Sequence, residues 1–163
     1  MNILKCVLIM AVAFCARPLL AQSSPIKVKV TRVSGAQSVL ETKTPREVKL
    51  RVNIQNLTSK PLEGLEVRWM FVVDTSYAPR QFEEGKKSVE LKPLATAEFD
   101  SSVVEVSRNT TYGPQLRGHW LRISHEGKTL FEEYNPQTLK KIIEQHEKDK
   151  EKGIQNRKKN EEL

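Results

Sequence analysis

The fold is decided by the stretch Glu47-Val48-Lys49-Leu50-Arg51-Val52-Asn53-Ile54, in which polar and apolar side chains strictly alternate. Successive side chains of a β-strand point to opposite faces of a sheet, so this period of two predicts a strand with one buried and one solvated face. The same period occurs in residues 26–31 and again in residues 65–73. We therefore predict a set of strands that bury one side against a common core.

Shorter segments continue the pattern as far as Tyr134. Val89 and Leu91 predict a short strand. Residues 97–106 predict a longer one, in which the inward-facing set changes parity near Ser101-Ser102, as a β-bulge would cause. Residues 116–134 contain His125-Glu126-Gly127 between two strand patterns, which predicts a hairpin with a positive φ at the glycine.

About seven short strands without an interior helical pattern predict an all-β fold over residues 25–134. We expect an immunoglobulin-like sandwich of two sheets, and a small barrel is the alternative.

At Asn135-Pro136 the apolar period becomes helical. Asparagine is favoured as a helix N-cap and proline at the first helical position, so we predict that a helix begins there. Its apolar stripe consists of Leu139, Ile142, Ile143 and His146. Residues 147–163 carry many charges of both signs and only one internal apolar side chain, Ile154, which predicts a solvated helix or disorder. Residues 135–163 are thus expected to form a C-terminal helix and a charged, partly disordered tail.

Residues 1–21 have the three parts of a secretory signal peptide: the basic Lys5, the apolar run Val7–Phe14, and a small residue, Ala21, at the expected cleavage site. Cleavage after Ser23 is the alternative, and the rival interpretations are a lipoprotein signal at Cys15 or an uncleaved anchor. The apolar run is shorter than the roughly 20 residues of a transmembrane helix. We expect a periplasmic or secreted protein without a transmembrane segment after cleavage.

Both cysteines, Cys6 and Cys15, lie in this signal, so the remaining chain contains none. Small extracellular domains commonly carry disulfides, and their absence favours a bacterial envelope. Removal of Lys5 and Arg17 with the signal lowers the formal net charge from +7 to +5, which is modestly basic.

Two runs resemble parts of exported bacterial proteins with immunoglobulin-like or fibronectin-III-like β-sandwiches. Val52–Trp69 (VNIQNLTSKPLEGLEVRW) resembles a strand-to-strand corner, and Arg117–Lys128 (RGHWLRISHEGK) resembles the penultimate-strand hairpin. The resemblance implies a sandwich and an envelope location. It carries over no functional residue.

The residues that bear chemistry form no catalytic pattern. The chain has no Gly-x-Ser-x-Gly turn for a nucleophilic serine, and its acidic pairs, such as Glu83-Glu84, are too common to indicate glycoside hydrolysis. His119 and His125 are six residues apart on one predicted strand, about 20 Å at 3.3 Å per residue, so one metal ion cannot bind both. We interpret them as surface histidines and expect a non-enzymatic protein without a metal or cofactor; a hydrolase is a distant third hypothesis.

Two surfaces are candidates for binding. The first consists of Met70, Val72, Trp120 and Arg122, which the strand parity places outside the core. It predicts a patch for a protein partner or a sugar ring. We favour the competing interpretation, in which the C-terminal helix covers these side chains.

The second surface is basic. Lys27, Lys29, Lys49 and Arg51 alternate with core residues, so they project from one solvent face if their strands belong to one sheet. Such a face could bind lipopolysaccharide phosphates or acidic glycans. Nucleic acid is not expected, since no aromatic side chains are interleaved for base stacking. The competing interpretation, which we favour, is an ordinary solvated face whose lysines prevent edge-to-edge aggregation.

The sequence therefore predicts an exported, non-enzymatic envelope protein that binds or spaces a partner through a sheet face. The alternative is a module that binds carbohydrate or an anionic polymer through its basic strands.

Overall fold

A computed structural model describes residues 24–35, 46–76, 78–107 and 113–161 of the chain, and for residues 155–161 only the backbone. The expected signal peptide at 1–21, both cleavage sites and both cysteines lie outside these residues. Within them, no helix is long and apolar enough to cross a membrane.

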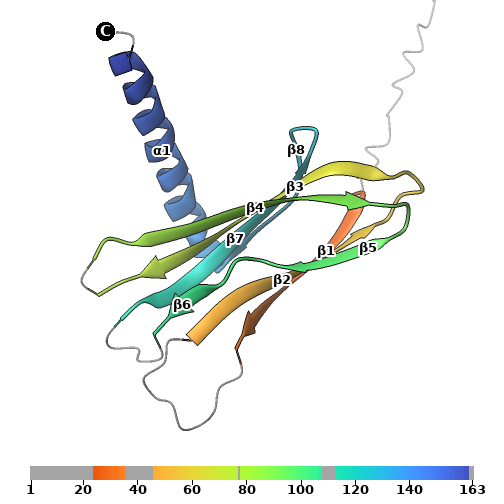
Figure 1. Ribbon diagram of the computed structural model, residues 1–163, viewed down its shortest axis with the longest axis horizontal. Coiled ribbons are helices and arrows are strands. Elements are labelled where there is room, and N and C mark those ends of the chain that lie inside the picture. The colour runs from red at the N-terminus through yellow and green to blue at the C-terminus, as the bar shows by residue number, and fades with distance from the viewer. Residues whose placement is uncertain (1–23, 36–45, 77, 108–112, 162–163) are drawn as a thin grey trace, which may run out of the picture.

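Eight strands form two antiparallel sheets in the described part of the chain (Figure 1). The strands are β1 (Ile26–Ser34), β2 (Arg46–Asn56), β3 (Leu62–Asp74), β4 (Gln81–Leu91), β5 (Thr96–Asp100), β6 (Val104–Val106), β7 (Gln115–His125) and β8 (Lys128–Asn135). One sheet has the order β1-β2-β5, with β6 also paired to β2, and the other has the order β4-β3-β7-β8. A short 3-10 turn, η1 (Gln137–Leu139), and the helix α1 (Lys140–Glu161) follow.

This arrangement confirms the predicted two-sheet sandwich and excludes the barrel. If β5 and β6 are counted as one interrupted strand, the described residues form seven strands, in the order of an immunoglobulin constant domain with one change. The fourth strand, β4, pairs with β3 instead of joining the sheet of β1 and β2.

The predicted bulge is present between β5 and β6. Arg51 pairs with Asp100 and Val48 with Val104, so two residues of β2 oppose three residues, 101–103, of the bulged strand. Ser101 closes the gap: its hydroxyl accepts the Leu50 N–H at 2.9 Å, and its own N–H donates to the Leu50 carbonyl at 2.8 Å. The extra residue restores the inward orientation of Val104 after Phe99, and both are buried.

The main core fills the space between the sheets. The alternating residues of β2 and β3 supply most of it, and Trp69, on β3, is only 6% exposed, as its parity predicted. The members from these two strands are Val48, Leu50, Val52, Ile54, Leu62, Leu65, Val67, Trp69, Phe71 and Val73. The β7–β8 hairpin turns at Glu126, with φ 50°, and Gly127, with φ 77°, the two positive values that a type I′ turn requires.

Strand β4 is longer than predicted. The pattern of Val89 and Leu91 identified only its last residues, whereas the strand begins at Gln81. Residues 83–88 are almost entirely polar or glycine, because β4 is an edge strand with little core to contact. Gly85 fits closely against the indole of Trp69, where a Cβ atom would overlap the ring.

The helix begins later than Asn135 and Pro136 predicted. Asn135 is the last residue of β8 and pairs with His119, so it remains extended and cannot cap a helix. Pro136 occupies the N-cap of η1 with an extended ψ of 162°, and α1 starts at Lys140. Sheet pairing therefore overrides the local N-cap signal of the Asn-Pro pair.

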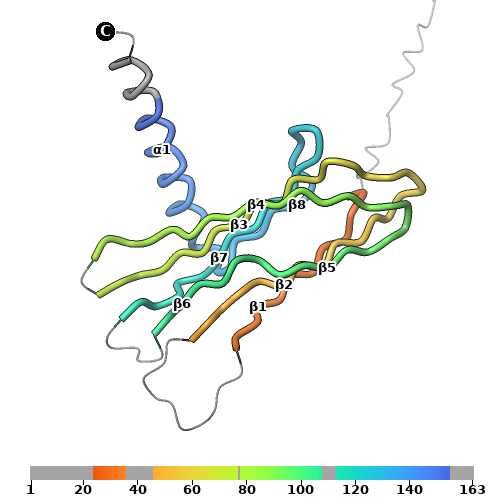
Figure 2. Tube along the Cα trace, in the orientation of Figure 1, coloured from red at the N-terminus to blue at the C-terminus, as the bar shows by residue number. Residues whose placement is uncertain are grey.

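Only the first turns of α1 lie against the sheet, and the rest points away from the sandwich (Figure 2). Leu139 and Ile143 are fully buried, which stabilises the docked helix by about 1.5–3 kcal/mol for each side chain. Farther along, Ile154 is 51% exposed. The predicted apolar stripe thus docks, while the charged tail continues as helix to Glu161.

His119 is not a surface histidine, contrary to the prediction. It shares the inward side of β7 with Leu121 and Ile123 and is 3% exposed. Its Nε2 lies 3.4 Å from Glu133 Oε1 on β8 without the geometry of a hydrogen bond, and it has no other acceptor in the described residues. Burial lowers the pKa of His119, Glu133 opposes that shift, and Arg32 on β1 adds to it.

We predict that Gly118→Ala undocks the helix. A Cβ at position 118 would overlap the carbonyl oxygen of Asn135 and would lie 2.7 Å from carbons of Pro136 and Leu139. The substitution should lower the free energy of unfolding by at least about 2 kcal/mol and shift the Trp120 fluorescence to longer wavelength. Gly153→Ala is the matched control, because nothing lies within 4 Å of that position. Equal stability of the two variants would contradict the prediction.

A second prediction concerns pH. The unfolded chain binds a proton at His119 more readily than the folded protein, because burial disfavours the charged imidazole. The stability from this group is therefore present above the unfolded pKa of about 6.5 and is lost as the pH falls below it. Urea unfolding at several pH values between 8 and 5 should show this loss in the wild type and a smaller loss in His119→Gln. A His119→Gln variant that loses as much stability as the wild type over this pH range would contradict the prediction.

Candidate ligand-binding surfaces

The first predicted surface is assembled but covered. Met70 on β3 pairs with Trp120 on β7, and Val72 on β3 pairs with Gly118 on β7, so the side chains of Met70, Val72 and Trp120 do share the outer side of the sheet formed by β4, β3, β7 and β8. All three are at most 1% exposed, because Leu139 and Ile143 cover them in a second apolar cluster. With the helix docked they form no patch for a partner, in agreement with the interpretation that we favoured.

Arg122 completes this covered surface as a polar border. Its guanidinium lies 4.8 Å from the centre of the Trp120 ring and donates to Glu132 at 2.9 Å. The indole N–H of Trp120 also donates to Glu132, at 3.1 Å. Partial burial alone would raise the pKa of Glu132, but these two hydrogen bonds hold it below its ordinary value. Trp120 and Arg122 thus share the Glu132 carboxylate as their acceptor, and this network holds the buried tryptophan in place.

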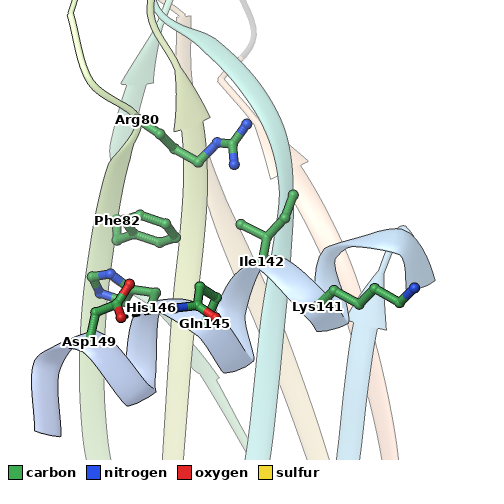
Figure 3. Close-up of a pocket in the computed structure, with 7 residues that line it drawn as sticks. All are labelled: Arg80, Phe82, Lys141, Ile142, Gln145, His146 and Asp149. Carbon is green, nitrogen blue, oxygen red and sulfur yellow. Dashed lines mark hydrogen bonds between the residues drawn. The ribbon is translucent and has the colours of Figure 1, made fainter. Parts of the chain in front are cut away.

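A groove runs beside the docked helix, between α1 and the first half of β4 (Figure 3). Its volume is about 390 Å³, and its apolar wall consists of Phe82 and Ile142. The rings of Phe82 and His146 stack with their centres 3.7 Å apart. The remaining lining residues are Arg80, Lys141, Gln145 and Asp149.

Most polar groups around this groove already have partners. Arg80 pairs with Asp74 at 2.6 Å, and Gln145 donates to Asp149 at 2.8 Å. At the end of the groove, Glu84 binds Lys150 at 2.8 Å and lies 3.3 Å from His146 Nε2. The contacts of Glu84 join β4 to the helix. Sequence reasoning missed the groove, because Phe82 is the one apolar side chain of β4 before Val89 and a single residue leaves no alternating pattern.

The second predicted surface lies on the outer side of the sheet formed by β1, β2, β5 and β6. Lys29 pairs with Asn53, and Arg51 pairs with Thr31, so alternate residues of β1 and β2 project from the same side. Lys27, Lys29, Lys49 and Arg51 all belong to this set. We call this side of β1 and β2 the basic face. The structure therefore brings the four predicted cations together, and no described helix covers them (Figure 1).

Two of the four cations are neutralised by β5, a feature that sequence reasoning missed. Asp100 binds Lys49 at 2.5 Å and Arg51 at 3.0 Å, and Glu98 lies 3.7 Å from Arg51. The hydrogen bonds from Arg51 and Lys49 lower the pKa of Asp100 to about 2. Lys27 and Lys29 are exposed, and neither has a carboxylate within ion-pair distance among the described residues.

The face has little other chemistry. No group of three His, Cys, Asp or Glu side chains in the described residues could hold a metal ion. Both tryptophans are buried elsewhere, so neither is available to stack on a sugar ring at this face. The basic face can therefore offer exposed ammonium groups and the polar side chains of Asn53, Gln55 and Thr31 to an anionic ligand.

Comparison with known proteins gives a likeness of shape only. No protein-family model matches the chain, and no curated protein matches it in sequence. Among solved structures, the Escherichia coli curli protein CsgC aligns with a TM-score of 0.43 and 7% identity, over 66% of this chain and 97% of CsgC. The putative ApaA protein from Bordetella pertussis aligns with a TM-score of 0.39 and 17% identity, over 67% of this chain and 86% of that protein. The strand order described above, independently of these structures, establishes a two-sheet β-sandwich of immunoglobulin-like design.

Proposed function

We propose that this chain is an exported, non-enzymatic protein of a bacterial envelope that binds a polyanionic component through its basic face. The observation that carries the proposal is the position of Lys27 and Lys29. They stand exposed on a sheet face that no described element covers, beside Lys49 and Arg51. The ligand class is a phosphate- or carboxylate-bearing envelope component, such as an acidic glycan or lipopolysaccharide.

The covered state of the other sheet supports this choice over a protein partner at Met70, Val72 and Trp120. An occupant of that surface would have to displace Leu139 and Ile143, which are fully buried. The cations of the basic face need no such rearrangement, because Lys27 and Lys29 already face solvent.

The ion pairs within the face determine where its unpaired positive charge lies. Asp100 and Glu98 hold Lys49 and Arg51 toward β5, so free positive charge is concentrated on β1. An extended polyanion would therefore bind along β1 and the adjacent side of β2. Salt screens the attraction between these exposed cations and an anionic ligand, with a screening length of about 10 Å at 0.1 M. Binding should therefore weaken steeply as the ionic strength rises.

The first test reverses the two exposed charges. Lys27→Glu/Lys29→Glu should weaken binding to dextran sulfate at least tenfold, since each cation near an anionic surface contributes roughly 1 kcal/mol. Retention on a dextran sulfate column and its elution salt would measure the loss. Lys148→Glu/Lys152→Glu on the exposed side of α1 changes the net charge by the same amount and is the matched control. An equal loss in both variants would mean attraction by net charge alone and would overturn the proposal.

The second test releases the paired cations. Asp100→Asn removes the carboxylate that binds Lys49 and Arg51, so it should tighten dextran sulfate binding by roughly fivefold. Because the pKa of Asp100 is about 2, the carboxylate stays charged at neutral pH, and acid is needed to mimic the variant. Asp149→Asn on α1 removes the same charge away from the face. The proposal fails if both substitutions change the dissociation constant equally.

A further inference from the structure

We propose that the polyanion is presented by a lipid bilayer, and that Leu57 and Leu94 insert into it beside the basic face. This inference rests on the proposed function and names its target: a membrane surface with anionic headgroups. We call the two side chains the leucine tip.

The leucine tip continues the basic face at one end of the sandwich. Gln55 of β2 pairs with Lys27 of β1 and with Thr96 of β5, and continuing both registers by two residues reaches Leu57 and Leu94. The Leu57 N–H donates to the Pro25 carbonyl at 2.9 Å. The Leu94 N–H donates to the Thr58 carbonyl at 3.2 Å. The ends of β1, β2 and β5 are thus held together, with the two leucines next to the row that contains Lys27.

Both leucines are exposed in a way that the fold does not require. Leu57 is 49% exposed and Leu94 is 67% exposed; among the described residues, Val103 and Ile154 are the other exposed large apolar side chains, and neither lies in the two loops that carry the leucines. Leu94 also has a φ of 56°, in the left-handed region that glycine and asparagine adopt more readily than leucine. A bulky apolar residue is therefore held in solvent at a position where glycine or asparagine would fit the backbone better.

A buried amide makes the tip rigid. Asn56 is fully buried, and its Nδ2 donates to the carbonyls of Lys60 at 2.8 Å and Lys92 at 3.1 Å. Its Oδ1 accepts the Thr58 N–H at 2.9 Å and the Thr58 hydroxyl at 2.8 Å. One side chain thus ties the loop after β2 to the loop after β4, so the exposed leucines lose little conformational freedom on insertion.

The charge around the tip fits an anionic bilayer. Lys60 and Lys92 belong to the same two loops and are exposed. Together with Lys27 and Lys29 they place four cations beside two apolar side chains. Of the nearest acidic residues along the chain, Glu63 and Glu90 belong to β3 and β4 of the other sheet. Glu98, four residues after Leu94, is on β5 and lies 3.7 Å from Arg51.

A bilayer suits this arrangement better than the other occupants. A soluble polyanion offers no apolar interior, so it would gain nothing from the leucines. A stable protein interface buries about 800 Å² on each partner, far more than two leucine side chains supply. A membrane takes a small apolar tip and a set of cations at the same time, because headgroup phosphates lie directly above the acyl chains.

The experiment uses the chain from Gln22 onward, which contains every described residue and lacks the apolar leader. The wild type should co-sediment with vesicles of phosphatidylcholine and phosphatidylglycerol, and not with phosphatidylcholine alone. Leu57→Asn/Leu94→Asn should weaken this binding at least tenfold while its retention on dextran sulfate stays unchanged. Ile154→Asn removes another half-exposed apolar side chain, far along α1, and should sediment like the wild type.

Leu94→Asn alone shows that a loss of binding is not a loss of folding. Asparagine tolerates a positive φ, so this variant should melt roughly 2–4 °C above the wild type while it binds vesicles less. A melting temperature below that of the wild type would contradict the assigned backbone cost, and wild-type sedimentation of the double variant would overturn the inference.

The outcomes separate the two proposals. Retention on dextran sulfate without vesicle binding would overturn the bilayer and leave the proposed function in place, with a soluble polymer as the ligand. If the wild type is neither retained on dextran sulfate nor co-sediments with the vesicles, both proposals are overturned. Vesicle binding that depends on the leucines and is unaffected by Lys27→Glu/Lys29→Glu would overturn the basic face as the site.

Discussion

The constraint on which the rest of the structure depends is that β3 is apolar on both of its faces. Phe71 points into the core between the sheets, while Met70 and Val72 point outward, and all three are buried. A two-layer sandwich covers only one face of each sheet, so this strand requires a third layer. The helix supplies it, and Gly118 allows the chain after β8 to approach closely enough for Leu139 to pack. Both faces of the sheet of β4, β3, β7 and β8 are therefore buried, and neither is free to bind a partner.

Strand periodicity predicted this fold well wherever a strand is half buried. It identified β2, the inward side of β3 and the bulge at Ser101, because each leaves a mark in the alternation of apolar residues. It failed at β4, where an edge strand needs few apolar side chains. It also misplaced the start of the helix, because Asn135 pairs with His119 of β7 and stays extended instead of capping a helix. Pairing between distant segments overrides local preference, and one sequence read alone does not contain that pairing.

The candidate site shows the same division. Parity within β1 and β2 was enough to place Lys27, Lys29, Lys49 and Arg51 on one side. It could not show that Asp100 and Glu98 neutralise half of them, because those residues reach the face only through the pairing of β5 with β2. The buried state of His119 escaped prediction for a related reason. Its residue type suggested the surface, whereas its parity with Leu121 pointed inward, and parity was the better guide.

The two sheets thus differ in what they can still do. The sheet of β4, β3, β7 and β8 carries a core on each side, whereas the open side of the sheet of β1, β2, β5 and β6 is polar, with its charges partly paired. Leucines that stay in solvent at the end of that open side are costly, and at Leu94 the backbone conformation adds to the cost. Leu94 carries two costs, the exposure of an apolar side chain and a positive φ. Contact with a membrane surface accounts for both, whereas the fold accounts for neither. Because the buried Asn56 side chain bonds to both loops, the fold itself holds these leucines in solvent. The basic face beside them requires that the surface they contact be anionic.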